Sequence, residues 1–177
     1  MFKAQQKSFF TGVFILAAVV LFTVLMGCSQ NPLQSASQDQ PRLLKRNLAA
    51  MKIGDVPAYT DTVLSAATGG VVSLADVELT FPPRALSNDT LIFIDIPDIA
   101  VFENHFGTDG LRFNAPVKVV MSYRDAELVG INESTIRLAW LNDATGEWNS
   151  MACTLDTVNK TVAGYLQHFS AYALISD

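Results

Sequence analysis

The sequence is poor in the residue types that most often carry catalytic or metal-binding chemistry. Its 177 residues include only two cysteines and two histidines, His105 and His168. Two cysteines are too few for a disulfide-stapled miniprotein or for a structural zinc site of four thiolates. The chain contains neither a Gly-x-Ser-x-Gly nor a His-Glu-x-x-His pattern. These absences argue against the common serine hydrolase and zinc protease classes.

Basic residues are scarce as well. The chain has 12 Lys and Arg against 17 Asp and Glu. Without its first 27 residues, which include Lys3 and Lys7, ten basic and 17 acidic side chains remain, and the net charge is −7. Such an acidic chain is poorly suited to bind nucleic acid by neutralising phosphates. No glycine-rich loop leads from a strand into a helix, so no nucleotide cofactor is expected either.

The N-terminus, residues 1–27, has the order of a secretory signal peptide. Lys3 and Lys7 form a positive start, and residues 9–25 form an apolar stretch with no charged side chain. This stretch has 17 residues, which is close to the ~20 that cross a bilayer. A plain transmembrane anchor is therefore the alternative interpretation of this segment.

The motif Leu25-Met26-Gly27-Cys28 comes next and resembles the lipobox of bacterial lipoproteins. A Leu stands three residues before the cysteine and a small residue directly before it, although Met26 is bulkier than is usual at its position. The resemblance implies cleavage before Cys28 and attachment of lipid, including palmitate, to that cysteine. Ser29 and Gln30 follow in place of Asp, which favours the outer membrane over the inner one. We therefore expect a lipid-anchored protein of the bacterial cell envelope that faces the periplasm or the exterior.

Residues 28–60 are expected to tether the lipid to a folded domain. Residues 29–40 are polar and lack apolar periodicity, which indicates a flexible linker. Within residues 42–53, apolar side chains three to four positions apart predict a short helix. We expect this whole segment to add little to the stability of the domain.

The folded domain is expected over residues 61–177 and is predicted to be all-β. Apolar and polar residues alternate over residues 77–81, 92–96, 117–123 and 136–140, as half-buried strands require. Glycine, proline and asparagine clusters separate these runs. No helix of ten residues fits after residue 71. Short strands at this spacing predict an antiparallel β-sandwich or a partly open barrel.

Four short segments resemble a known family when they are taken in order. They are GGVVSL at residues 69–74, VELTFPPRAL at 77–86, LRFNAPV at 111–117 and QHFSAYAL at 167–174. Together they are similar to the ZU-five domain of ankyrins, netrin receptors and zonula occludens proteins, although Arg84 replaces the usual glycine. The resemblance covers residues 69–175 and implies a β-sandwich. Its members mostly act as docking domains, which favours a role in protein interaction.

The tripeptide His168-Phe169-Ser170 carries the sharpest chemical hypothesis. In self-cleaving relatives of the family, the serine attacks the carbonyl of the preceding phenylalanine. The resemblance implies that Ser170 is the nucleophile, that Phe169 carries the carbonyl that is attacked, and that His168 assists. The structural alternative makes Phe169 a core side chain in a C-terminal strand that runs on with both faces covered, or that bulges near His168. Because cleavage would release only residues 170–177, we expect an intact chain and favour no catalytic residue.

Several polar side chains between residues 95 and 109 suggest either oxygen ligands for calcium or a mixed site for a harder transition metal. They are Asp95, Asp98, Glu103, Asn104, His105 and Asp109. Their spacing matches no EF-hand, so we expect a solvated acidic loop and no metal. Trp148 and Tyr165 offer a weak case for carbohydrate binding, whereas Trp140 and Cys153 are expected to pack against the core.

The sequence therefore predicts a non-enzymatic domain at the cell envelope. The lipidated Cys28 would hold it to the membrane, and an envelope or surface protein would be its partner. A domain that cleaves itself between Phe169 and Ser170 is the alternative function.

Overall fold

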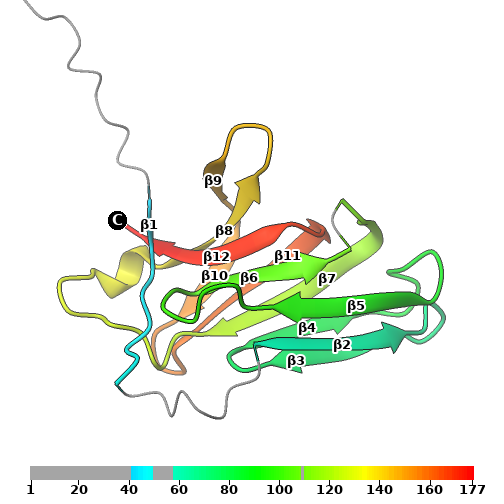
Figure 1. Ribbon diagram of the computed structural model, residues 1–177, viewed down its shortest axis with the longest axis horizontal. Helices are drawn as coiled ribbons and strands as arrows, with labels where there is room; N and C mark the ends of the chain where they lie inside the picture. Colours follow the sequence, from blue (N-terminus) through cyan, green and yellow to red (C-terminus); the bar gives the residue numbers. More distant parts are fainter. Residues whose placement is uncertain (1–40, 50–57, 109) are drawn as a thin grey trace, which may run out of the picture. The chain divides into compact units, whose positions relative to one another are not determined.

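The computed structural model describes residues 41–49, 58–108 and 110–177, which all belong to one compact unit. Within these residues the chain forms twelve strands in two antiparallel sheets (Figure 1). The prediction of an all-β antiparallel sandwich is confirmed. The helical structure of the described residues is one 3₁₀ turn, η2 (Glu133–Thr135), which the Asn132 side chain caps by accepting the Ser134 amide.

The first sheet has seven strands and includes both ends of the domain. Its order is β2-β5-β6-β12-β8-β9, and β1 also pairs with β12. The bounds of these strands are β1 Arg42–Leu43, β2 Tyr59–Leu64, β5 Thr90–Asp95, β6 Glu103–Gly107, β8 Arg137–Asn142, β9 Glu147–Ser150 and β12 Ala171–Ser176.

The second sheet has five strands in the order β10-β11-β7-β4-β3. The bounds are β3 Gly70–Leu74, β4 Val77–Phe81, β7 Arg112–Ser122, β10 Cys153–Asp156 and β11 Thr161–His168. The alternation predicted from the sequence is visible in β4, where Val77, Leu79 and Phe81 are buried and Glu78 is exposed. The predicted runs 92–96, 117–123 and 136–140 correspond to β5, β7 and β8, with shifts of a few residues at their ends.

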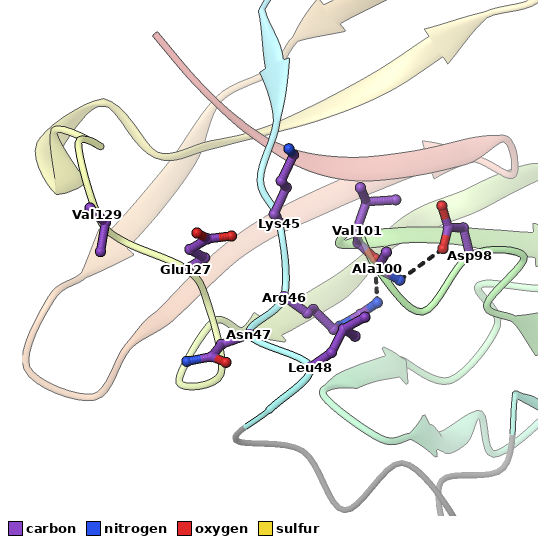
Figure 2. Close-up of a pocket in the computed structure, with 9 residues that line it drawn as sticks. All are labelled: Lys45, Arg46, Asn47, Leu48, Asp98, Ala100, Val101, Glu127 and Val129. Carbon is purple, nitrogen blue, oxygen red and sulfur yellow. Dashed lines mark hydrogen bonds between the residues drawn. The ribbon is translucent and has the colours of Figure 1, made fainter.

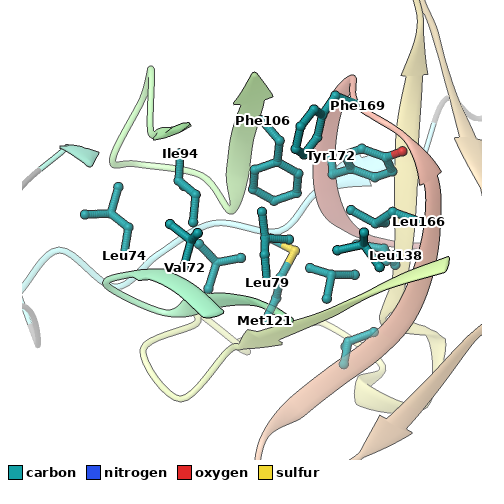
Figure 3. Close-up of a cluster of buried hydrophobic side chains, with 14 of the residues drawn as sticks. Val72, Leu74, Leu79, Ile94, Phe106, Met121, Leu138, Leu166, Phe169 and Tyr172 are labelled. Atoms are coloured by element: carbon teal, nitrogen blue, oxygen red, sulfur yellow. The ribbon is translucent and has the colours of Figure 1, made fainter. Parts of the chain in front are cut away.

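The core lies between the facing sides of the two sheets (Figure 3). Each sheet contributes the apolar members of its alternating strands, such as Leu79 and Met121 from one sheet and Ile94 and Leu138 from the other. Aromatic rings fill the end of the core at which β11 leads into β12, where Phe106, Phe169 and Tyr172 are all buried. Burial of an aliphatic or aromatic side chain is worth about 1.5–3 kcal/mol before entropy, so this interior is the main source of stability.

The N-terminal segment of the domain is a strand and not the helix predicted for residues 42–53. β1 pairs with the C-terminal strand, Arg42 opposite Ser176, and the Leu44 amide donates to the Leu174 carbonyl at 2.8 Å. Leu44 is 1 % exposed. The helix prediction is wrong over residues 42–49 because pairing with β12 satisfies the backbone and buries this leucine; residues 50–53 lie outside the described residues. The sandwich therefore includes residues that the sequence assigned to the tether.

Candidate functional site

The tripeptide His168-Phe169-Ser170 lies where the chain passes from one sheet to the other. β11 ends at His168 in the five-stranded sheet, and β12 begins at Ala171 in the seven-stranded sheet. The pairing of β11 with β7 shifts register between Leu166 and His168. Of the two arrangements left open by the sequence, the irregular one near His168 is correct. A crossing of this kind turns the chain out of one ladder and into the next.

Phe169 is a core residue of this crossing. Its side chain is 2 % exposed, and its ring centroid lies 4.8 Å from that of Phe113 and 6.1 Å from that of Phe81. The Phe169 amide donates to the Leu111 carbonyl at 2.9 Å. The residue whose carbonyl would be cleaved is thus held by both its ring and its backbone.

Ser170 is also buried, with 7 % of its surface exposed. Its hydroxyl donates to the Leu141 carbonyl oxygen at 2.9 Å. A carbonyl oxygen orients the hydroxyl but cannot take up its proton at neutral pH, so this bond does not activate a nucleophile. The arrangement satisfies a buried hydroxyl, as structural serines require.

His168 contacts the carbonyl that self-cleavage would attack. Its Nδ1 lies 3.0 Å from the Phe169 oxygen, and its ring packs nearly at right angles to that of Trp140 at a centroid distance of 5.3 Å. The Tyr172 hydroxyl donates to the His168 carbonyl at 2.7 Å, and burial raises the pKa of this tyrosine. A protonated Nδ1 would polarise the Phe169 carbonyl. However, no hydrogen bond among the described residues joins His168 to the Ser170 hydroxyl.

The polar residues between 95 and 109 do not gather into one site, although Asp95 stands opposite His105 in the pairing of β5 with β6. Asn104 points into the core and is fully buried, whereas Glu103 and His105 pair with each other at 2.9 Å on the outer face of β6. Asp98 accepts the Ala100 amide at 2.8 Å in a loop, and Asp109 lies outside the described residues. Within the part of the chain that the structure describes, no three side chains of the metal-binding types gather into a site.

The aromatic residues and Cys153 have separate surroundings. Trp140 packs against the core, as does the half-buried Cys153, whose sulfur accepts the Leu138 amide at 3.4 Å. Trp148 lies on β9 of the seven-stranded sheet, but Tyr165 lies on β11 of the other sheet. The two residues proposed for carbohydrate binding therefore do not share a face.

A pocket of about 650 Å³ lies beside the N-terminal segment (Figure 2). Its lining residues are Lys45, Arg46, Asn47, Leu48, Asp98, Ala100, Val101, Glu127 and Val129. This set contains no histidine, cysteine or serine, so it offers no pair of a serine or cysteine nucleophile with a histidine base. The pocket carries no catalytic chemistry of the kind that the sequence suggested.

Arg46 is a buried charged residue that sequence reasoning missed. Its side chain is 2 % exposed and forms a bidentate ion pair with Asp76, with distances of 3.0 and 3.1 Å from Nη2 to the two carboxylate oxygens. It also donates to the Val101 carbonyl, and its guanidinium lies 4.3 Å from the centre of the Phe102 ring. Burial raises the pKa of the Asp76 carboxyl, and the neighbouring Arg46 opposes that shift. The group is structural, since it joins the N-terminal segment to the turn between β3 and β4.

Cys28 and the predicted signal peptide, residues 1–27, lie outside the described residues. Across residues 41–49, 58–108 and 110–177, no helix is long and apolar enough to cross a bilayer. No protein-family model matches the chain, and no curated protein is similar enough in sequence to count as its relative.

Proposed function

We propose that this protein is a lipid-anchored β-sandwich of the bacterial cell envelope that acts as a non-enzymatic interaction or structural module. The observation that carries the proposal is the lipobox-like motif at residues 25–28, placed shortly before a compact sandwich that begins at β1. Thirteen residues, 29–41, separate Cys28 from β1. A flexible linker of that length has a root-mean-square span of about 20 Å. The domain would thus be held close to the membrane surface.

A ZU-five-like identity is part of the proposal. It is supported by the two antiparallel sheets and by the place of the His-Phe-Ser tripeptide, where β11 gives way to β12. By analogy with that family, the domain would bind a protein of the envelope or cell surface. The residues after Cys28 favour the outer membrane, with the domain facing the periplasm or the exterior.

Self-processing between Phe169 and Ser170 remains the alternative function. The contact between His168 Nδ1 and the Phe169 oxygen favours it, because a donor at that carbonyl would stabilise a developing oxyanion. The bond from the Ser170 hydroxyl to Leu141 opposes it, since no base receives the proton. The proposal therefore keeps the chain intact.

Lipidation is tested by feeding radiolabelled palmitate to bacteria that express the full chain. The wild type should take up label and lose residues 1–27, whereas Cys28→Ala should accumulate as an unlabelled precursor. Cys153→Ala is the matched control, because it removes the other cysteine and should be labelled like the wild type. Unchanged labelling of Cys28→Ala would end the lipoprotein interpretation.

A further inference from the structure

The edge strand β2 presents a row of backbone groups that no described strand uses. β2 pairs with β5 on one side only. The Ile96 amide donates to the Ala58 carbonyl at 2.8 Å, which sets the alternation of this antiparallel ladder. Alternate residues of β2 therefore bond to β5, whereas the N–H and C=O groups of Tyr59, Asp61 and Val63 point away from it. The strand has neither Lys nor Pro and pairs over six residues without a bulge, so Asp61 is the one edge-protecting feature that it carries.

The side chains of the same residues lie on the outer face of the sheet and make an exposed apolar ledge. Val63 is 65 % exposed and stands opposite Leu91, which is 48 % exposed. Tyr59 is 51 % exposed and stacks on Phe93 at a centroid distance of 5.8 Å. The Phe93 ring lies across Gly107, where an added Cβ would overlap it at 1.5 Å. The ledge is thus a fixed surface built from β2, β5 and β6.

The surroundings of this ledge are acidic. Asp61 lies between Tyr59 and Val63 and accepts the Tyr59 hydroxyl at 3.1 Å, and Asp95 is the residue opposite Tyr59. Desolvation and both carboxylates raise the pKa of Tyr59. β2, β5 and β6 contain no Lys or Arg.

The negative charge of this face distinguishes among the partners that could bind to an apolar sheet edge. Anionic lipid repels carboxylates, so the bilayer is a poor partner for this face. A second copy paired through its own β2 would bring two Asp61 side chains close together, and like charges across strands are destabilising. An extended segment with a cation opposite Asp61 would hydrogen-bond to the outward-pointing backbone groups of β2, cover the apolar ledge and pair with the Asp61 carboxylate.

We propose that the outer edge of β2 binds an extended segment of a partner protein that carries Lys or Arg flanked, two positions away on each side, by apolar residues. The cation would lie opposite Asp61, and the two apolar side chains would contact Tyr59 and Val63. The residues between them would lie beside Thr60 and Thr62, which suits small polar side chains. This inference rests on the proposed role as an interaction module and names the surface and the chemistry of its partner.

The probe is the capped heptapeptide Thr-Val-Thr-Lys-Thr-Val-Thr, titrated into the isotope-labelled full chain in detergent and followed by amide resonances. Shifts should concentrate on residues 59–64. The Lys peptide should bind about fivefold more tightly than the same peptide with Glu in place of Lys.

Three variants of the protein test the surface. Asp61→Lys should reverse the preference for the Lys peptide, and Glu147→Gln, on the edge strand β9, should leave that preference unchanged. Val63→Pro removes an N–H that β5 does not use and should weaken both peptides.

Equal binding of the two peptides, shifts away from β2, or no reversal in Asp61→Lys would overturn the proposal. The melting temperature of each variant shows whether its fold is intact, and Asp61→Lys changes an exposed side chain only. Palmitate labelling of Cys28 is independent of every peptide result. A failure of the docking surface is therefore distinguishable from a failure of the proposed lipid anchor.

Discussion

Arg46 and Asp76 are separated by 29 residues in sequence and meet at the end of the sandwich where β1 packs. The arginine is nearly fully buried, and its carboxylate partner is 17 % exposed. The attraction between two opposite charges offsets the cost of removing them from water only while both charges are present. A buried pair is for this reason a poor measure of net stability but a sensitive marker of which segments must stay together.

We predict that Arg46→Met lowers the free energy of unfolding by about 3 kcal/mol, because it leaves the Asp76 carboxylate buried without a cation. The double variant Arg46→Met with Asp76→Asn should lose less, because the carboxylate is then gone as well. Arg137→Met is the control, since its pair with Asp177 is exposed and should be worth less than about 1 kcal/mol. Chemical denaturation of the three variants measures the differences. Similar small losses for Arg46→Met and Arg137→Met would contradict the buried-pair account.

At the scale of elements, β1 shows how a short strand can matter to a domain. It has two residues, yet the segment behind it buries Leu44 and brings Arg46 to Asp76. The Phe102 amide donates to the Leu44 carbonyl, which adds one more backbone hydrogen bond to those between β1 and β12. The N-terminal segment is therefore part of the fold, in contrast to the expectation from the sequence.

A chain that begins at residue 58 should lose this segment and melt more than about 10 °C below the protein that keeps it. The reason is the lost burial of Leu44 together with an uncompensated Asp76. The matched control deletes residues 29–38 only and should melt within a few degrees of the intact protein. Thermal unfolding followed by circular dichroism tests this, and equal melting of both deletions would show that β1 adds nothing.

The sequence predicted the strands whose side chains alternate cleanly and missed those whose alternation is broken. In β4 every inward residue is apolar, so the run 77–81 was recognised with its exact bounds. In β6 the inward positions are Asn104 and Phe106. Because Asn104 is polar, the sequence showed no apolar alternation there, and the segment was interpreted as a set of candidate metal ligands. β1 was missed because Leu43 and Leu44 are adjacent and carry no period of two. Long-range pairs such as Arg46 with Asp76 leave no local signal at all.

The candidate site was predicted in position but not in geometry. The apolar run from Phe169 to Ile175 indicated a buried C-terminal strand, and both of these side chains are buried. The direction of the Ser170 hydroxyl depends on Leu141, a residue of β8 that meets it only in the folded chain. Sequence spacing could therefore name the tripeptide but could not decide between nucleophile and structural serine.

At the scale of the whole molecule, β12 occupies the middle of the seven-stranded sheet. It pairs with β6, β8 and β1, and its apolar side chains after Ala171 are buried. A cut before Ser170 would leave residues 170–177 held in the sheet by hydrogen bonds and burial, so native measurements would not reveal it. Only a denaturing measurement on the mature protein distinguishes an intact lipid-anchored module from a self-processed one.

That measurement is the intact mass, under denaturing conditions, of the protein purified from membranes of bacteria that express the full chain. We predict one species, residues 28–177 with lipid attached at Cys28, and the same species less one oxygen atom for Ser170→Ala. A wild-type chain that ends at Phe169 and a separate fragment of residues 170–177, with neither seen in Ser170→Ala, would contradict the account. So would a wild-type chain that retains residues 1–27 or carries no lipid.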